Sequence, residues 1–245
     1  MWAFCLHSLA REYGWEFFRR IVLPHPVRTV RAAMAARALD VSGDRVALFP
    51  GVSECRFGGA GSIVGLGFCL KPIDPPCPAG RFNHDCAYLE TLPRSEAANL
   101  PAACRQCAIR EIGTLALRAG AAVYVMTSAK DILLDVYAPA LGEGRFSAGL
   151  FVLCRYSLKP FAVGLLAAGV RGWMFPFEKG DCRDYETWLR ADRGIKEERT
   201  EIDSPSRGAI RNILLDAAKD PASAARFEKR GHVLYPLAAS GGETK

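Results

Sequence analysis

The chain has 245 residues, of which 50% are hydrophobic, 24% charged and 10% aromatic. This balance is typical of a globular protein and excludes a disordered tail, a collagen-like chain and a coiled-coil rod. The net charge of +6 comes from 32 basic and 26 acidic residues that are spread along the chain. Such a weak bias, without a basic stripe, does not indicate a nucleic-acid-binding protein.

No apolar stretch reaches the roughly 20 residues that a transmembrane helix needs. The longest candidates are short or contain glycines, and they lie at residues 62–70 and 161–170. The N-terminal residues 1–23 carry charges throughout and lack the basic-then-apolar order of a secretory signal. We therefore expect a cytoplasmic protein without a transmembrane segment.

Two helices are predicted over the first forty residues, which form an N-terminal helical extension (residues 1–40). The first covers residues 2–22 and ends before two prolines, and the second is the alanine-rich segment 27–39. These helices either pack on the domain or form an amphipathic surface that binds a membrane or a partner. Packing is favoured because the apolar face is no wider than a buried stripe.

The central residues 41–200 alternate between short apolar runs and helical patterns. The predicted strands are residues 45–49, 62–68, 121–126, 149–153 and 170–175, and helices are predicted at 108–118, 129–137 and 160–168. Continuous apolar runs indicate strands that are buried on both faces. The sequence thus predicts a three-layer α/β domain with a mostly parallel sheet, helices on both faces and a cysteine-rich insertion near residues 69–107.

The last part of the chain is polar and has helical periodicity. Helices are predicted at residues 185–192 and 206–218, and a further helix at 220–231 that begins at a proline and ends at a glycine. We therefore expect a C-terminal helical tail over residues 201–245.

Cysteine is the most distinctive residue type of the chain. There are nine: Cys5, Cys55, Cys69, Cys77, Cys86, Cys104, Cys107, Cys154 and Cys182. An odd number in a chain of this size, without an export signal, indicates metal binding, redox chemistry or catalysis more than disulfide formation. For Cys5 and Cys55 we favour the role of small buried or incidental side chains.

Three of the cysteines follow predicted strands. Cys69 and Cys154 come directly after strands, and Cys182 lies in the loop after another. Because ligands bind at the carboxyl ends of parallel strands, these thiols are expected at one edge of the sheet. Each is equally well explained as a site thiol or metal ligand and as an ordinary buried or loop residue.

Four other cysteines form a local group. Cys77 and Cys86 bracket a short loop, while Cys104 and Cys107 form a Cys-x-x-Cys pair at the start of the predicted helix 108–118. Four thiolates suit a structural zinc ion or an iron–sulfur cluster, and the helix N-terminus favours the thiolate form. The spacing is not that of a standard zinc ribbon. His84 is a further possible ligand, although a hydrogen-bonded histidine explains it equally well.

Polar side chains also follow the strand at residues 121–126. Thr127, Ser128 and Lys130 lie at a predicted helix start, where free N–H groups and a positive charge can bind an anion. Simple capping of the helix is the more economical explanation.

The order of these motifs resembles a prokaryotic cysteine-rich family that is known only as a domain of unknown function. The shared features are Phe68-Cys69-Leu70, Cys77-Pro78, Cys104-x-x-Cys107 with the helix after it, and Val152-Leu-Cys154, over about residues 62–157. The resemblance implies an iron–sulfur cluster. The family has a close triplet of cysteines before the helix, whereas here Pro101 takes the place of the first, and Cys86 is the candidate substitute.

The leading hypothesis is therefore a cytoplasmic iron–sulfur protein, with a [4Fe–4S] cluster bound by Cys77, Cys86, Cys104 and Cys107 and with Cys69 and Cys154 as second-choice ligands. It would transfer electrons or act on a small anionic molecule or a redox partner protein. One alternative is a structural zinc site in a non-catalytic interaction module. Another is a metal-free enzyme with Cys154 or Cys69 as nucleophile.

Overall fold

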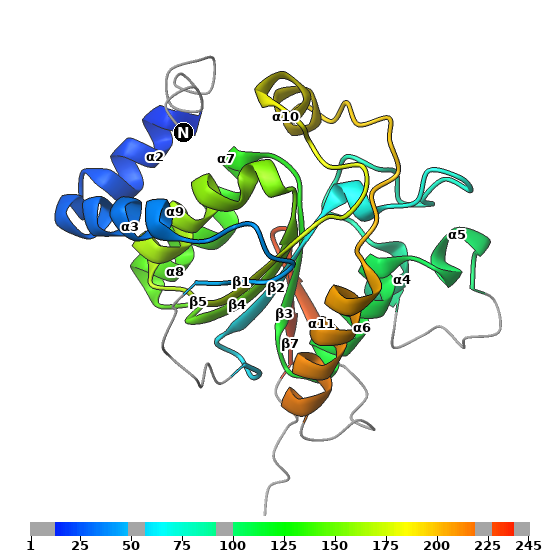
Figure 1. The fold of residues 1–245 in the computed structure, drawn as a ribbon. Coiled ribbons are helices and arrows are strands. Elements are labelled where there is room, and N and C mark those ends of the chain that lie inside the picture. The colour runs from blue at the N-terminus through cyan, green and yellow to red at the C-terminus, as the bar shows by residue number, and fades with distance from the viewer. Residues whose placement is uncertain (1–12, 49–56, 92–99, 219–226, 238–245) are drawn as a thin grey trace, which may run out of the picture.

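The computed structural model describes residues 13–48, 57–91, 100–218 and 227–237, and its elements lie within these ranges. The fold is mixed α/β, with one seven-stranded sheet in the order β1-β5-β4-β2-β3-β7-β6. The strands are β1 (Val46–Ala47), β2 (Ser62–Gly67), β3 (Ala122–Met126), β4 (Ala148–Leu153), β5 (Arg171–Pro176), β6 (Phe227–Arg230) and β7 (Val233–Pro236). Figure 1 shows the sheet between two groups of helices.

Helices alternate with the central strands, and the label η marks a 3-10 or π-helical segment. They are α2 (Trp15–Phe17), η2 (Phe18–Val22), α3 (Pro26–Ala38), η3 (Phe68–Leu70), α4 (Ala87–Thr91), α5 (Ala102–Arg105), α6 (Ala108–Arg118), α7 (Ala129–Ile132), η5 (Leu133–Tyr137), α8 (Ala138–Glu143), η6 (Arg155–Ser157), α9 (Leu158–Ala168), α10 (Tyr185–Asp192) and α11 (Ser204–Ala217).

The four central strands are parallel. β2 pairs with β3 and β4, and β4 pairs with β5, all in parallel register. β1 and β7 add antiparallel strands at the two sides. Every residue of β2, β3 and β4 is buried, as their continuous apolar runs predict for strands covered on both faces.

Successive strand residues enter two separate hydrophobic cores. Val64 and Leu66 of β2 pack with α4, α6, α10 and α11 on one face of the sheet. Ile63 packs with η2, α3, η5 and α9 on the other. The predicted three-layer α/β architecture is confirmed.

The N-terminal helices cover part of the second face. Ala32 and Ala36 are buried, and α3 packs against α9 (Figure 1). The packing predicted for this segment is therefore present for one side of α3. The other side of α3 exposes the apolar side chains of Val27 and Met34, and Trp15 of α2 is exposed as well; each is about 60% exposed.

Two predicted boundaries are wrong. The helix expected to stop before Pro139 continues to Glu143, because the wider π-helical turn η5 precedes the proline and leaves space for its ring. Within the described residues, the end of the helix expected at 220–231 is instead strand β6, which forms a hairpin with β7, and Gly231 has a φ of 58° in the turn. The tail after residue 201 is thus helical only in α11 within the part that the structure describes.

None of the helices in the described ranges has the length and apolar character needed to cross a membrane. Cys5 and Cys55, which we interpreted as incidental thiols, lie outside the described residues.

Candidate functional site

A topological switch point lies between β2 and β4. The chain leaves β2 toward α6 on one face of the sheet, and it leaves β4 toward α9 on the other. Loops that diverge in this way open a crevice at the carboxyl ends of the two strands. Cys69 and Cys154 occupy that position, one after β2 and the other after β4.

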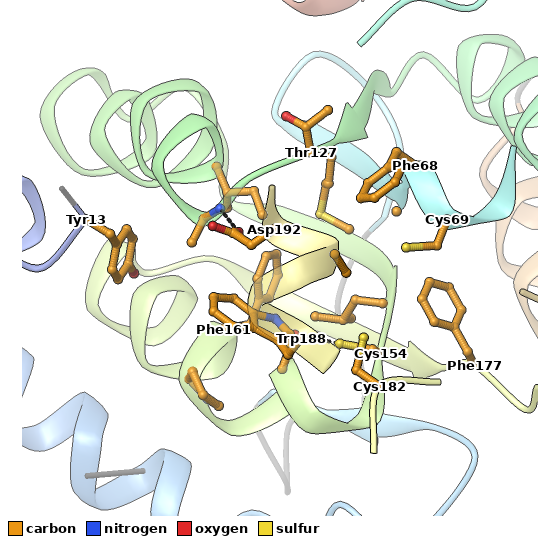
Figure 2. A pocket seen from close by; sticks show the side chains of 18 of the residues that line it. Tyr13, Phe68, Cys69, Thr127, Cys154, Phe161, Phe177, Cys182, Trp188 and Asp192 are labelled. Atoms are coloured by element: carbon orange, nitrogen blue, oxygen red, sulfur yellow. Dashed lines mark hydrogen bonds between the residues drawn. The ribbon is translucent and has the colours of Figure 1, made fainter. Parts of the chain in front are cut away.

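A pocket fills this crevice (Figure 2). Its walls are mainly apolar and aromatic, with Phe68, Phe161 and Trp188 among them, and three thiols line it: Cys69, Cys154 and Cys182. The space between the walls is about 750 Å³, counting the part open to solvent. The structure therefore brings the three cysteines that follow strands to one site, as their positions predict.

Cys154 and Cys182 are held side by side by a shared carboxylate. Asp181 Oδ1 accepts hydrogen bonds from the backbone N–H of Arg155 at 3.0 Å and from that of Cys182 at 2.9 Å. The loop after β4 is thereby tied to the loop after β5. The two thiols are hydrogen-bonded to each other, and Figure 2 shows their sulfur atoms together at one wall of the pocket.

A chain of hydrogen bonds leads to this pair. Trp188 Nε1 donates to Ser157 Oγ at 2.8 Å, and Ser157 Oγ lies 2.7 Å from Cys154 Sγ. Because an indole N–H can only donate, the Ser157 hydroxyl accepts from it and is free to donate its own proton to Cys154. This leaves the S–H of Cys154 free to donate to Cys182, and that interaction lowers the pKa of Cys182.

The three pocket thiols differ in acidity. The hydrogen bond from Cys154, together with the nearby charge of Lys196, lowers the pKa of Cys182. The same hydrogen bond and burial raise the pKa of Cys154 well above its usual value. Burial raises the pKa of Cys69 to about 12. Cys182 is therefore the thiol that ionises most readily in this pocket.

The four cysteines of the insertion also come together. Cys77 lies in the loop after η3, Cys86 directly precedes α4, Cys104 lies in α5 and Cys107 directly precedes α6. Repulsion from the Cys77 thiolate contributes to raising the pKa of each of the other three. Cys86 and Cys107 also act on each other. The four thiols are therefore near enough to interact electrostatically.

Helix N-termini point at two of these thiols. The backbone N–H groups of Ile109 and Arg110 oppose the rise in the pKa of Cys107, and those of Tyr88 and Leu89 do the same for Cys86. Burial nevertheless dominates and raises the pKa of Cys86 to about 12. Burial thus favours the protonated thiols, while the local N–H groups are arranged to favour the thiolates.

A buried lysine lies beside the same group. Lys71 is only 2% exposed, and its ammonium group donates to Gly80 O at 3.1 Å and to Asn83 O at 3.0 Å. These bonds fix the loop between Cys77 and Cys86. The charge of Lys71 acts on the thiols of Cys77, Cys86 and Cys107, so it stabilises negative sulfur there.

The two groups of thiols share one segment of chain. Cys69 lines the pocket, and Lys71 lies two residues later beside the second group. The guanidinium of Arg81 donates to Cys69 O at 3.3 Å and to Lys71 O at 3.4 Å, and it also bonds the carbonyl of Lys196. The insertion is thus anchored to the edge of the sheet.

The predicted anion site at the start of α7 has internal partners. Ser128 caps the helix in a reciprocal capping box with Asp131, whose carboxylate also accepts from Thr127 Oγ1 at 2.7 Å. The N–H of Ala129 donates to Asp192 Oδ1 at 2.7 Å. Two carboxylates therefore occupy the groups that an anion would contact, and Lys130 is exposed to solvent.

One other set of possible metal ligands lies among the described residues. Ligand atoms of His84, Asp135 and His232 lie within 4.8 Å of one another. The two imidazole rings stack almost parallel with their centroids 3.9 Å apart, and His84 Nδ1 donates to Val125 O at 2.8 Å. Parallel rings direct their ring nitrogens side by side instead of toward one ion, so this set is a hydrogen-bonded stack rather than a formed metal site.

Sequence reasoning missed Lys71, Asp181 and Trp188. Each is a common residue type in a loop or on a helix, and its role depends on burial and on partners distant in the chain. The only signal in the sequence is position, since Lys71 lies two residues after Cys69 and Asp181 directly precedes Cys182.

No protein-family model matches this chain, and no curated protein or solved structure is significantly similar to it. Its function is therefore inferred from the two groups of thiols at the carboxyl edge of the sheet.

Proposed function

We propose that the protein is an iron–sulfur redox protein, with a [4Fe–4S] cluster bound by Cys77, Cys86, Cys104 and Cys107. The observation that carries this proposal is the interaction of the four thiols with one another, together with a buried ammonium group that acts on Cys77, Cys86 and Cys107 and fixes the loop between the first two. Four cysteine thiolates are the usual ligands of such clusters. The bound cluster supplies one-electron chemistry.

The thiols are not arranged as a ready-made zinc site. In a tetrahedral zinc site with bonds of about 2.3 Å, the sulfur atoms lie about 3.8 Å apart. Among the described residues, no three of these cysteines have sulfur atoms within 4.8 Å of one another.

The surroundings of the thiols also suit a cluster. Backbone N–H groups at the starts of α4 and α6 are directed at Cys86 and Cys107, where they would stabilise negative sulfur. Cys86 stands beside Cys107, so it supplies the ligand that Pro101 does not. Free thiols in this number also favour a reducing compartment, and we place the protein in the cytoplasm.

The pocket gives the cluster a place to act. It opens at the switch point, and the three-residue segment from Cys69 to Lys71 connects it with the group that holds the cluster. Its apolar walls favour a small, mostly uncharged molecule or a side chain of a partner protein over the small anion that the sequence suggested.

The test is to purify the full chain without oxygen and to measure iron, sulfide and zinc per chain with the visible absorption spectrum. The proposal predicts a brown protein with about four iron and four sulfide ions per chain. A colourless protein with one zinc per chain would instead establish the structural zinc site.

Matched variants locate the cluster. Cys77→Ser, Cys86→Ser, Cys104→Ser and Cys107→Ser should each lose most of the iron, whereas Cys69→Ser and His232→Ala should keep it. Circular dichroism shows whether each variant is folded. Full iron content in the folded Cys104→Ser and Cys107→Ser variants would contradict the proposal.

A further inference from the structure

We infer that Cys154 and Cys182 form a redox-active dithiol, in which Cys182 attacks a small, uncharged disulfide bound in the pocket and Cys154 resolves the product. This activity does not require the cluster, since neither residue belongs to the group around Cys77. It uses a thiol, Cys182, that the cluster hypothesis leaves without a role.

The first support is the position of the pair. Two loops that are distant in the sequence are tied by Asp181, so the two thiols are held together at one wall of the pocket (Figure 2). A disulfide forms without a large movement of the backbone when two such side chains already face each other. Both sulfur atoms line the pocket, where a small molecule can reach them (Figure 2).

The second support is the direction of the hydrogen bonds. Trp188 donates to Ser157, the Ser157 hydroxyl is free to donate to Cys154, and Cys154 donates to Cys182. The relay therefore ends at Cys182 and favours its thiolate, which is the nucleophilic form. The nearby charge of Lys196, a residue only 7% exposed, acts in the same direction.

The chemistry of the exchange balances without a further reactant. The Cys182 thiolate attacks one sulfur of the disulfide RSSR, the S–S bond breaks and RS⁻ leaves. Cys154 then attacks Cys182 Sγ, a protein disulfide forms, and the second RSH leaves with the proton of Cys154. Two electrons pass from the dithiol to the small disulfide.

The walls of the pocket define the substrate class. Phe68, Phe161, Phe177 and Met126 surround the thiols, and the polar part of the lining is small. Such a site favours a compact disulfide without charges over a large charged one such as oxidised glutathione.

The test uses the reduced, metal-free full chain and bis(2-hydroxyethyl) disulfide in the absence of oxygen. After rapid quenching with iodoacetamide, peptide mapping by mass spectrometry should show a Cys154–Cys182 disulfide as the first product. In Cys154→Ser the reaction should stop at a mixed disulfide on Cys182. In Cys182→Ser, Cys154 should carry no adduct.

Three control variants assign the reaction to this pair and to its relay. Cys69→Ser removes the third pocket thiol and should leave the product unchanged. Ser157→Ala breaks the relay and should slow the reaction of Cys182 by about tenfold, the rate equivalent of one hydrogen bond. Cys107→Ser removes a cluster ligand and should not affect the exchange, so failure of the cluster proposal leaves this result intact.

The inference is overturned if Cys154 and Cys182 of the wild-type protein are both recovered as alkylated thiols after prolonged exposure to excess disulfide, or if Cys182 is found linked to Cys69. Loss of bound metal from the holoprotein on Cys182→Ser substitution would also overturn it, because the pair would then be a metal ligand. The peptide map of the wild-type protein shows whether the Cys154–Cys182 disulfide forms, even if a cysteine variant does not fold.

Discussion

Asp181 accepts a hydrogen bond from the backbone N–H of Arg155 at 3.0 Å, across 26 residues of chain. Its other acceptor contact, from the N–H of Cys182, makes the carboxylate a bridge between the loops after β4 and β5. Burial raises the pKa of Asp181. The bridge therefore holds the pocket thiols together, but it places a charged carboxylate where water reaches it only in part.

Asp181→Ala should lower the free energy of unfolding by about 2 kcal/mol, because two backbone N–H groups lose their acceptor. Asp181→Asn keeps an acceptor oxygen and should cost less. Because the folded pKa is raised, wild-type stability should fall as the pH rises from the ordinary aspartate value toward the higher folded value. Urea unfolding at several pH values measures this. An unchanged pH dependence in Asp181→Asn would contradict the assignment.

The capping box at the start of α7 gives the opposite pH dependence. Hydrogen bonds from Thr127 and Ser128 lower the pKa of Asp131 despite its partial burial. Asp131→Ala should lower the free energy of unfolding by about 1 kcal/mol at pH 7. Because the folded pKa is depressed, the difference from wild type should shrink as the pH falls through that lower value.

The measurement for Asp131 is urea unfolding at pH 7 and at about pH 3, compared with Asp216→Ala on the exposed side of α11. Asp216→Ala should have a small effect at both pH values. Equal losses for Asp131→Ala at both pH values would show that its carboxylate does not stabilise the helix.

Gly164 and Gly208 both lie in helices but differ in the space that surrounds them. A Cβ at Gly164 in α9 would lie 2.3 Å from the ring of Tyr137, which is buried, whereas a Cβ at Gly208 in α11 would meet nothing within 4 Å. Gly164→Ala should lower the free energy of unfolding by about 1–3 kcal/mol, because the added methyl group overpacks the core. Gly208→Ala should stabilise by about 0.5–1 kcal/mol. Thermal unfolding of both variants tests the contrast, which fails if both shift in the same direction.

Lys71 links loop structure to iron binding. Lys71→Met removes the charge beside Cys77, Cys86 and Cys107 and leaves the carbonyls of Gly80 and Asn83 without their donor. We expect at least a tenfold loss of affinity for the cluster, since outer-shell partners of metal ligands typically contribute that much. Iron per chain after anaerobic reconstitution measures it, with the exposed Lys130→Met as control. Equal iron in both variants would contradict the role of Lys71.

The sequence predicts the centre of the fold because its strands are buried on both faces. The runs that form β2, β3 and β4 are continuous and mostly apolar, and the helices between them have clear ends. The same topology places Cys69 and Cys154 at one edge of the sheet. Local spacing alone groups Cys104 with Cys107.

The parts that the sequence does not predict depend on partners distant in the chain. β6 consists of Phe-Glu-Lys-Arg and is mostly exposed, so it has no apolar alternation to mark it as a strand, and only pairing with β7 defines it. Likewise, Cys182 is one loop thiol among several in the sequence, and only Asp181 and the neighbouring Cys154 give it a distinct environment.

All four thiols of the proposed cluster lie in the single crossover between β2 and β3, which spans the sheet edge but contributes no strand within the described residues. The core that contains α3 and α9 includes no residue of this crossover, so it can assemble on the sheet before any iron arrives. Maturation would be a late and local event, confined to one insertion, and the folded chain would be able to lose its inorganic centre and be reloaded with it.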